Sequence, residues 1–198
     1  MSGRGGAPRR PRPARIGASR GYTLIELVFA AGLITILAAA AIPQLTAGVE
    51  RSRTVGAARY LASRLALARA QAVARSANVA LLLTAVEGTF MVGTYVDGNG
   101  DGVRTRDIAA GIDTSVSVPV RLSSLFPRVV LFLNDPAVTS TFDTSALMSF
   151  SPLGTASSRT LYLRGADGSQ YAVRVLGATG RTRVLRLVAS NGAWVEVL

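Results

Sequence analysis

One uninterrupted apolar stretch constrains this chain more than any other feature of its sequence. Residues 22–42 read YTLIELVFAAGLITILAAAAI and carry one charged side chain, that of Glu26. As an α-helix the stretch would measure about 31 Å, which is close to the hydrocarbon thickness of a bilayer. A transmembrane helix is therefore predicted over residues 22–43.

The residues before this stretch predict its orientation. Residues 1–21 contain six Arg and no acidic residue, and they are rich in Pro and Gly. Such a segment cannot bury a core, so we expect a disordered basic tail. The positive-inside rule then keeps the N-terminus cytoplasmic and sends the C-terminal body across the membrane. A secretory signal peptide with AAAAIP as its cleavage site is the alternative, but its apolar core would be shorter and Glu26 fits it poorly.

The absent residue types limit the chemistry of the chain. It has no Cys and no His, and all 22 of its basic residues are Arg. Thiolate and His nucleophiles, Cys or His metal sites and Schiff-base lysines are therefore excluded, and we expect no enzyme. The net charge is +11, yet residues 79–198 hold ten Arg against nine acidic residues. The body is thus nearly neutral, and the high pI does not by itself indicate nucleic-acid binding.

Residues 44–78 continue the helical pattern in more polar form. Their Ala, Leu, Arg and Gln content favours a helix, so we expect one helix from about 23 to 77. Leu61, Leu65, Ala68 and Ala72 recur at helical spacing and predict the face that packs on the body. The evenly spaced Arg53, Arg64 and Arg75 form a second stripe, either a solvated face or a contact with DNA or an acidic neighbour. The half after the membrane segment is expected to be periplasmic.

Residues 79–198 change to the pattern of a β-rich head. Short runs with β-branched and aromatic residues are separated by Gly, Asp, Asn and Ser clusters. The runs are NVALLLTAV, TFMVGTYV, RVVLFL, ALMSF, RTLYLR, QYAVRVL, TRVLRLV and AWVEVL, the last read as an added strand or edge. The predicted fold class is α+β: a long N-terminal helix, its first half transmembrane, packed on one face of an antiparallel β-sheet head.

The start of the apolar stretch resembles a known processing site. Gly21-Tyr22-Thr23-Leu24-Ile25-Glu26 is similar to the prepilin cleavage site of type IV pilins and of type II secretion pseudopilins. The resemblance implies that residues 1–21 are a leader, that a prepilin peptidase cuts between Gly21 and Tyr22, and that Tyr22 is N-methylated. Phe or Met is usual at the position of Tyr22, and this leader is long and Arg-rich.

Glu26 would then be the fifth residue of the mature chain. The resemblance implies that its carboxylate pairs with the N-terminal amine of a neighbouring subunit during assembly. A carboxylate within a membrane helix is costly and gains most from a cation that is also leaving water. The alternative is that Glu26 lies near the interface and reaches water by itself.

Three further segments narrow the resemblance to the GspH/FimT minor pseudopilins. Residues 149–156, SFSPLGTA, resemble the FSPRGT segment of that family. The hairpin from Gln170 to Leu187, with Gly-Arg-Thr-Arg at 180–183, resembles the Arg hairpin that follows it, and LARAQAVARS resembles the LARSEAIKRG stretch of the long helix. The implied role is a structural subunit of a type II secretion pseudopilus or type IV pilus, whose partners are other pilin or pseudopilin subunits, the prepilin peptidase and the inner membrane.

A loop rich in Asp and Gly is a candidate calcium site. Asp97, Asn99 and Asp101 follow the D-x-N-x-D-G spacing of the first half of a calcium-binding loop. The twelfth position, which needs a bidentate acid, is Ile108, with Asp107 one residue early and Asp113 beyond. A hairpin turn explains the same residues without metal, so both interpretations stay open, and we expect no other cofactor.

The Arg hairpin is a candidate DNA site. In a strand Arg181 and Arg183 share one face, whereas Arg186 points to the other. Two guanidinium groups on one ridge can hold phosphates, and the resemblance links this motif with DNA binding in FimT-type pilins of natural transformation. Aromatic residues that could stack on bases are missing from the hairpin. The hypotheses are therefore a filament subunit, a DNA-capturing minor pilin, and a membrane-anchored β domain that is never processed.

Overall fold

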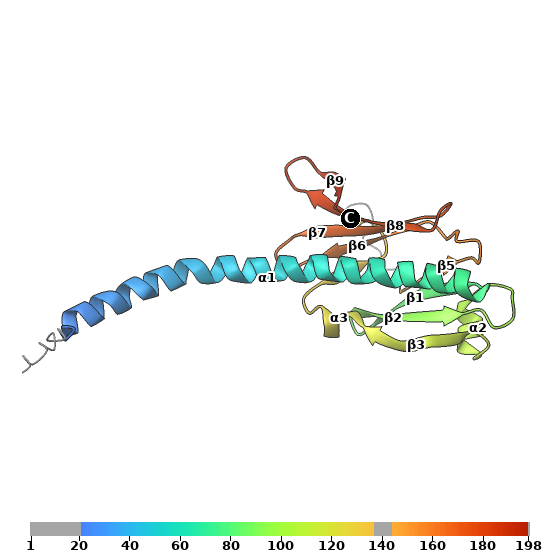
Figure 1. The fold of residues 1–198 in the computed structure, drawn as a ribbon, viewed down its shortest axis with the longest axis horizontal. Coiled ribbons are helices and arrows are strands. Elements are labelled where there is room, and N and C mark those ends of the chain that lie inside the picture. Colours follow the sequence, from blue (N-terminus) through green and yellow to red (C-terminus); the bar gives the residue numbers. More distant parts are fainter. Residues whose placement is uncertain (1–20, 137–143, 198) are drawn as a thin grey trace, which may run out of the picture. The chain divides into compact units, whose positions relative to one another are not determined.

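The computed structural model of the chain describes residues 21–136 and 144–197 (Figure 1). Residues 1–20, which make up nearly all of the expected leader, lie outside the described residues. The elements in chain order are α1 (Leu24–Arg75), β1 (Val79–Val86), β2 (Thr89–Val96), α2 (Thr105–Ala109), β3 (Thr114–Arg121), α3 (Leu122–Leu125), β4 (Val130–Phe132), β5 (Ser145–Phe150), β6 (Arg159–Arg164), β7 (Gln170–Leu176), β8 (Arg181–Val188) and β9 (Ala193–Glu196).

Helix α1 begins and ends within two residues of the predicted limits. It runs from Leu24 to Arg75, and it holds an apolar window long enough to cross a membrane by length and composition. It stops where Ser76 takes a left-handed φ of 51°, a conformation that an α-helix cannot continue through. The chain divides into two compact units between Ile42 and Pro43.

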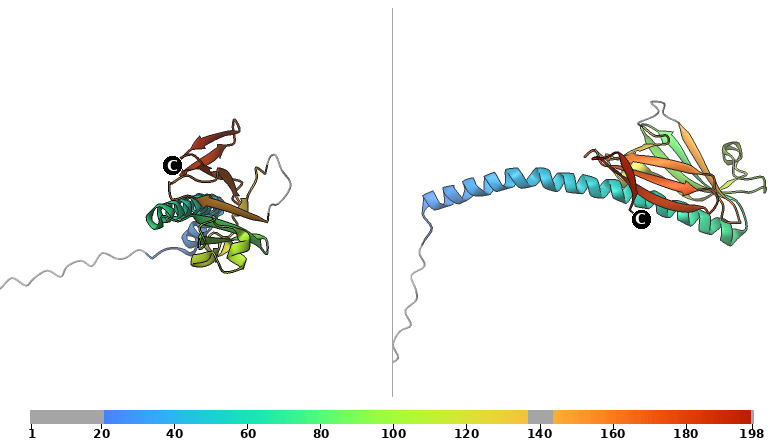
Figure 2. Two further views of the ribbon diagram at one scale, coloured as in Figure 1. Left: turned by 90° about the vertical axis from the view of Figure 1, so that its right-hand side faces the viewer. Right: turned by 90° about the horizontal axis from the view of Figure 1, so that it is seen from above.

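The second unit carries two antiparallel sheets where the sequence suggested one β body. The first sheet has the order β3-β2-β1-β5, and the second has the order β4-β6-β7-β8-β9. The last run of the sequence is β9, which lies at the edge of the second sheet as expected. In both views of Figure 2 the green strands β1 and β2 of the first sheet and the orange to red strands β6, β7 and β8 of the second lie beside the C-terminal half of α1.

Strand β3 is the strand that the sequence patterns missed, and the short helices α2 and α3 were not predicted either. It reads TSVSVPVR, so it contains Pro119 and lacks a run of large apolar residues. Proline donates no backbone hydrogen bond and is tolerated at the edge of a sheet. β3 pairs with β2 alone and has irregular register, so the sheet accommodates a sequence that reads as a loop.

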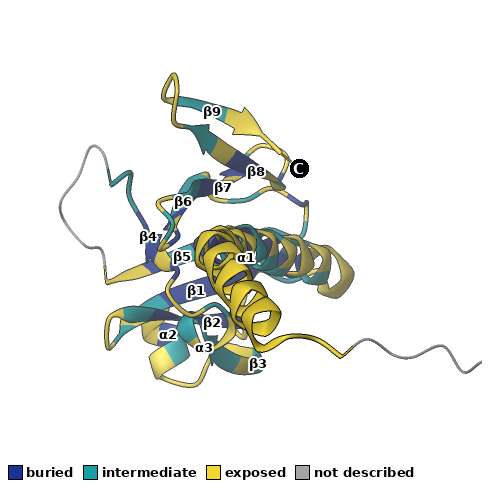
Figure 3. Cartoon of the chain, turned by 90° about the vertical axis from the view of Figure 1, so that its left-hand side faces the viewer, coloured by how far each residue is buried: buried dark blue, intermediate teal, exposed yellow. Residues whose placement is uncertain are grey.

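The hydrophobic core joins the helix to both sheets. The predicted packing face of α1 is confirmed, because Leu61, Leu65, Ala68 and Ala72 are all fully buried in it. The same core contains buried residues of both sheets: Leu81 and Leu83 of β1, Met148 and Phe150 of β5, Leu161 and Leu163 of β6, and Val173 and Val175 of β7. Figure 3 shows this half of α1 beside the two sheets, with buried segments facing it. The observed architecture is therefore the α+β, pilin-like arrangement that the sequence predicted.

Candidate functional site

The expected cleavage position lies just outside the first turn of α1. The hydroxyl oxygen of Thr23 accepts a hydrogen bond from the backbone N–H of Glu26 at 3.3 Å. The carbonyl of Thr23 accepts the N–H of Leu27 at 3.2 Å, the first bond of the helical ladder. Thr23 is therefore the N-cap, and the Gly21–Tyr22 peptide bond precedes the helix in exposed, non-helical backbone.

Glu26 occupies the third helical position after this cap. Thr-x-x-Glu is the spacing of a capping box, and an acidic side chain in the first turn interacts favourably with the helix dipole. The Thr-x-x-Glu spacing that indicates this capping role can be read from the sequence. An interpretation of Glu26 only as a carboxylate within the membrane does not include it. It adds to the pairing role implied by the family and does not exclude it.

The three segments that resemble the GspH/FimT family meet at one point. Arg69, from the LARAQ stretch of α1, donates a hydrogen bond from Nε to the carbonyl oxygen of Gly154 at 3.1 Å. Gly180, which opens the Arg hairpin at a φ of +60°, is buried against the same carbonyl and the same arginine. A Cβ at position 180 would overlap both. The motifs therefore form one packing junction between the helix and the two sheets.

The Arg hairpin divides its cations between two faces. Arg181 and Arg183 are exposed, whereas Val184, between Arg183 and Arg186, belongs to the core. Arg183 lies opposite Arg174 of β7 and forms an ion pair with Glu196 of β9 at 3.2 Å. Arg186 instead lies beside Tyr171 on the face that points to α1. Arg174, which the sequence analysis did not single out, is exposed between the buried Val173 and Val175.

Tertiary structure brings aromatic rings to the Arg183 face of the second sheet. Trp194 of β9 and Tyr162 of β6 meet edge to face with ring centroids 5.6 Å apart. Arg164 lies over the ring of Phe132 at 5.5 Å from its centroid. Burial and the nearby Asp135 charge raise the pKa of Tyr162, against a smaller opposing effect of Arg174. These rings come from three separate strands, so inspection of the hairpin alone could not find them.

The Asp-rich loop is organised by its own backbone. Asp97 Oδ1 accepts the N–H groups of Asn99 and Gly100, and Asp97 Oδ2 accepts that of Gly102 and the side-chain amide of Asn78. Burial raises the pKa of Asp97, but these hydrogen bonds lower it more, so the net direction is downward. Both carboxylate oxygens of Asp97 therefore accept hydrogen bonds within the loop, as the hairpin-turn interpretation expects.

The other acidic groups of this region pair with arginines or accept backbone N–H groups. Asp101 pairs with Arg104 and Arg106, while Asp107 pairs with Arg106 at 3.4 Å. Asp113 accepts the N–H groups of Gly98 and Arg104. Among the residues that the structure describes, no three acidic, His or Cys groups are arranged to hold a metal ion. Calcium binding at Asp97, Asn99, Asp101 and Asp107 stays a prediction.

A buried carboxylate on α1 was missed by the sequence analysis. The side chain of Glu50 is 10% exposed, and its Oε1 accepts hydrogen bonds at 2.9 Å from Arg53 and from Arg128. Arg128 follows α3 and has a left-handed φ of 65°, so the bond ties a strained loop to the helix. Arg53 therefore makes an ion pair within the head and is only partly exposed, at 38% of its side chain. Arg64, from the same predicted stripe, donates to the hydroxyl groups of Thr94 and Ser117.

Comparison with known proteins agrees with this architecture. The family model described as type II transport protein GspH matches residues 57–180, which is more than half of the 198 residues. The match begins within α1 and ends at Gly180, so it includes the whole packing junction of Arg69, Gly154 and Gly180. Searches of curated proteins and of solved structures returned no significant match. The chain belongs to the type II transport protein GspH family and is a GspH/FimT-like minor pseudopilin.

Proposed function

We propose that this pseudopilin is made as a prepilin, cut between Gly21 and Tyr22, N-methylated at Tyr22, and assembled as a structural subunit of a type II secretion pseudopilus or type IV pilus. The observation that carries the proposal is the position of the Gly21–Tyr22 bond, immediately before a helix that Thr23 caps. Exposed, non-helical backbone is where proteases cut most readily. The expected arrangement has a cytoplasmic leader and a periplasmic head.

Cleavage at this bond would also create the cation that Glu26 needs. The new amine at Tyr22 would lie four residues before Glu26, at the start of an apolar stretch. Within a filament, the amine of one subunit and the carboxylate of its neighbour can neutralise each other while both leave water. The apolar stretch supplies the packing surface and Glu26 supplies the register between neighbours.

The processing test is co-expression of the full chain with a prepilin peptidase, followed by intact mass measurement. We expect the loss of residues 1–21 and the mass of one added methyl group. Gly21→Val should block the cut because it changes the residue whose carbonyl is attacked, while Gly17→Val, within the leader, should not. An uncut wild-type chain would favour the third hypothesis, a membrane-anchored β domain that is never processed.

DNA capture is a second candidate function, supported by the cations on the Arg183 face of the second sheet. Arg181, Arg183 and Arg174 are exposed there on adjacent strands. Tyr162 and Trp194 on the same face supply aromatic rings of the kind that stack on bases. The ion pair of Arg183 with Glu196 weakens the case, because it occupies part of one phosphate-binding group.

The DNA test is a titration of the full chain in neutral detergent across a salt series. If the Arg183 face captures DNA, the variant with Arg181→Ala and Arg183→Ala should bind DNA at least about tenfold more weakly than wild type. The slope of log affinity against log salt concentration should also fall by about 2. Arg59→Ala with Arg75→Ala is the matched control, because it removes two cations from α1 instead. Equal weak binding by all three proteins would make the hairpin an ordinary surface and leave filament assembly as the function.

A further inference from the structure

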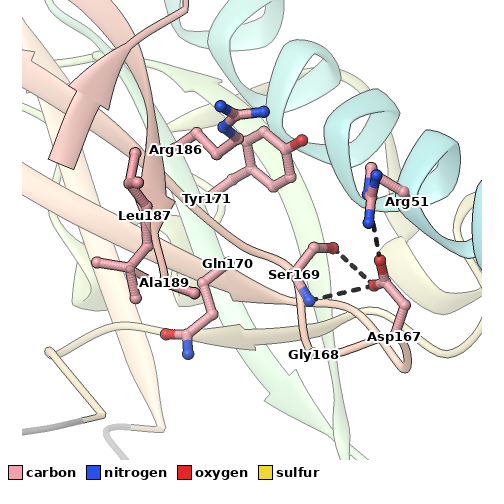
Figure 4. A pocket seen from close by; sticks show the side chains of 10 residues that line it. Arg51, Asp167, Gly168, Ser169, Gln170, Tyr171, Arg186, Leu187 and Ala189 are labelled. Atoms are coloured by element: carbon pink, nitrogen blue, oxygen red, sulfur yellow. Dashed lines mark hydrogen bonds and ion pairs between the residues drawn. The ribbon is translucent and has the colours of Figure 1, made fainter. Parts of the chain in front are cut away.

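A hollow of about 380 Å³ lies between α1 and one end of the second sheet (Figure 4). It is within the size range of small-ligand sites. One wall is helix α1 at Arg51, and the floor is the turn between β6 and β7. The other wall is the end of β8, from Arg186 to Ala189. We call it the Arg51–Arg186 hollow.

Two arginines line this hollow from opposite walls. Figure 4 shows Arg186 beside Tyr171 on the sheet and Arg51 on the helix, above Asp167. The Arg186 guanidinium makes no ion pair or hydrogen bond with any residue that the structure describes. The Arg51 side chain is 67% exposed, and its Nε lies 3.7 Å from Asp167 Oδ2, which is a long ion pair. Both guanidinium groups therefore keep donors for an external anion.

Asp167 holds the geometry of the hollow without cancelling its charge. Its side chain is 6% exposed, and its Oδ1 accepts the backbone N–H and the hydroxyl of Ser169. The neighbouring Glu50 carboxylate is already bonded to Arg53 and Arg128. This part of the head contains two carboxylates, Glu50 and Asp167, and four arginines, Arg51, Arg53, Arg128 and Arg186, which leaves a local charge of +2.

The sequence places this cation pair close to the predicted membrane segment. The apolar stretch ends at Ile42, nine residues before Arg51. Even fully extended, that length of chain reaches only about 30 Å, so the hollow can contact the headgroup layer while the apolar stretch is inserted. An anionic lipid surface attracts Arg side chains within about a Debye length.

We propose that the Arg51–Arg186 hollow binds the phosphate of an anionic phospholipid headgroup in the membrane that anchors the chain. The inference rests on the proposed function because it requires the apolar stretch to be inserted in the membrane. Bound lipid would hold the head at the surface before assembly, and extraction of the subunit into a filament would break the contact. The ligand chemistry is a phosphate monoanion, and the tether selects lipid as its source.

The test uses the full chain in neutral detergent, with native mass spectrometry to measure binding of phosphatidylglycerol and phosphatidylcholine. Wild type should prefer phosphatidylglycerol, and Arg51→Gln with Arg186→Gln should weaken that binding by about fivefold for each arginine. Arg59→Gln with Arg181→Gln is the matched control. It removes the same charge from the same helix and the same strand, outside the hollow, and it should retain wild-type affinity. Thermal melting of each variant verifies folding.

Two further measurements distinguish failure of the proposed lipid site from failure of membrane anchoring. Reconstitution into nanodiscs of phosphatidylcholine, alone or in equimolar mixture with phosphatidylglycerol, reports insertion independently of headgroup choice. A chain that enters both nanodiscs but shows no preference for phosphatidylglycerol overturns the lipid site and leaves the pseudopilin function intact. A chain that enters neither overturns membrane anchoring as well. Inorganic phosphate that binds as tightly as phosphatidylglycerol, with the same dependence on the two arginines, overturns the assignment to lipid.

Discussion

The carbonyl oxygen of Gly154 accepts a hydrogen bond from Arg69 Nε at 3.1 Å, across 85 residues of sequence. This bond joins helix α1 to the loop after β5, and Gly180 closes the same junction from the start of β8. Three segments that resemble the family in sequence are thus neighbours in space. Their shared contact gives a packing reason for Gly180, separate from any role of the arginine that follows it.

Gly180→Ala tests this junction. The new Cβ would overlap Gly154 and Arg69, and alanine also disfavours the φ of +60°. We expect a loss of about 3 kcal/mol in the free energy of unfolding, measured by chemical denaturation of the full chain in detergent. Gly88→Ala is the control, since Gly88 has a φ of +75° with nothing within 4 Å, and it should cost about 1 kcal/mol. Equal losses would mean that backbone strain alone explains the glycine.

Glu26→Leu separates membrane insertion from assembly. Removal of the carboxylate should leave insertion intact or improve it, while reducing incorporation into filaments, because the neighbouring amine loses its partner. Membrane fractionation and immunoblotting of sheared filaments measure the two steps. Thr23→Ala is the control that weakens the cap by about 1 kcal/mol but keeps the charge, so it should still be incorporated. Normal incorporation of Glu26→Leu would contradict the pairing role.

The lowered pKa of Asp97 predicts that the stability of the Asp-rich loop depends on pH in the acidic range. Hydrogen bonds from Asn78 and three backbone N–H groups outweigh burial and lower its pKa below the ordinary value of about 3.9. A lowered pKa in the folded state stabilises it fully above the ordinary pKa and loses that contribution as the pH falls through the folded value. Wild type should therefore melt at a lower temperature as the pH drops from 5 to about 3. Asp97→Asn should show a weaker dependence, whereas equal slopes would exclude Asp97 as the cause.

The turn interpretation and the calcium interpretation of the same loop predict different responses to calcium. Because both oxygens of Asp97 already accept N–H donors, we expect calcium chloride to leave the melting temperature unchanged relative to magnesium chloride. Differential scanning fluorimetry of the full chain in detergent measures this directly. A calcium-specific rise that Asp101→Asn abolishes would establish the metal site and show that the loop rearranges to bind it.

Glu50 should matter more for stability than an exposed acidic residue. Glu50→Gln removes the charge that holds Arg53 and Arg128, and about 1–2 kcal/mol of unfolding free energy should be lost, since both arginines remain partly solvated. Glu87→Gln breaks a 2.9 Å pair with Arg121 in which both side chains are exposed, so it should cost about 0.5 kcal/mol or less. Denaturant titration of both variants provides the comparison. Similar losses would mean that burial of Glu50 adds nothing.

The sequence alone determined the features that depend on neighbouring residues. The apolar stretch, the limits of α1 and its Leu61 packing face follow from composition and helical period, and most strands follow from short runs of β-branched and aromatic residues between turn residues. The cleavage motif and the Asp-rich loop are likewise contiguous in sequence, so their residue types could be recognised without a fold. The cap of Thr23 on Glu26 was equally local, and a search for the Thr-x-x-Glu spacing would have found it.

Only the tertiary structure decided which distant residues meet. The division into two sheets, the edge position of β3, the pairing of Trp194 with Tyr162 and the Arg51–Arg186 hollow all depend on long-range strand pairing. Glu50 and Arg128 are 78 residues apart, and neither carries a local signal of its partner. Local propensity acts over a few residues, whereas these contacts are selected by how the two sheets and the helix bury their shared apolar faces together.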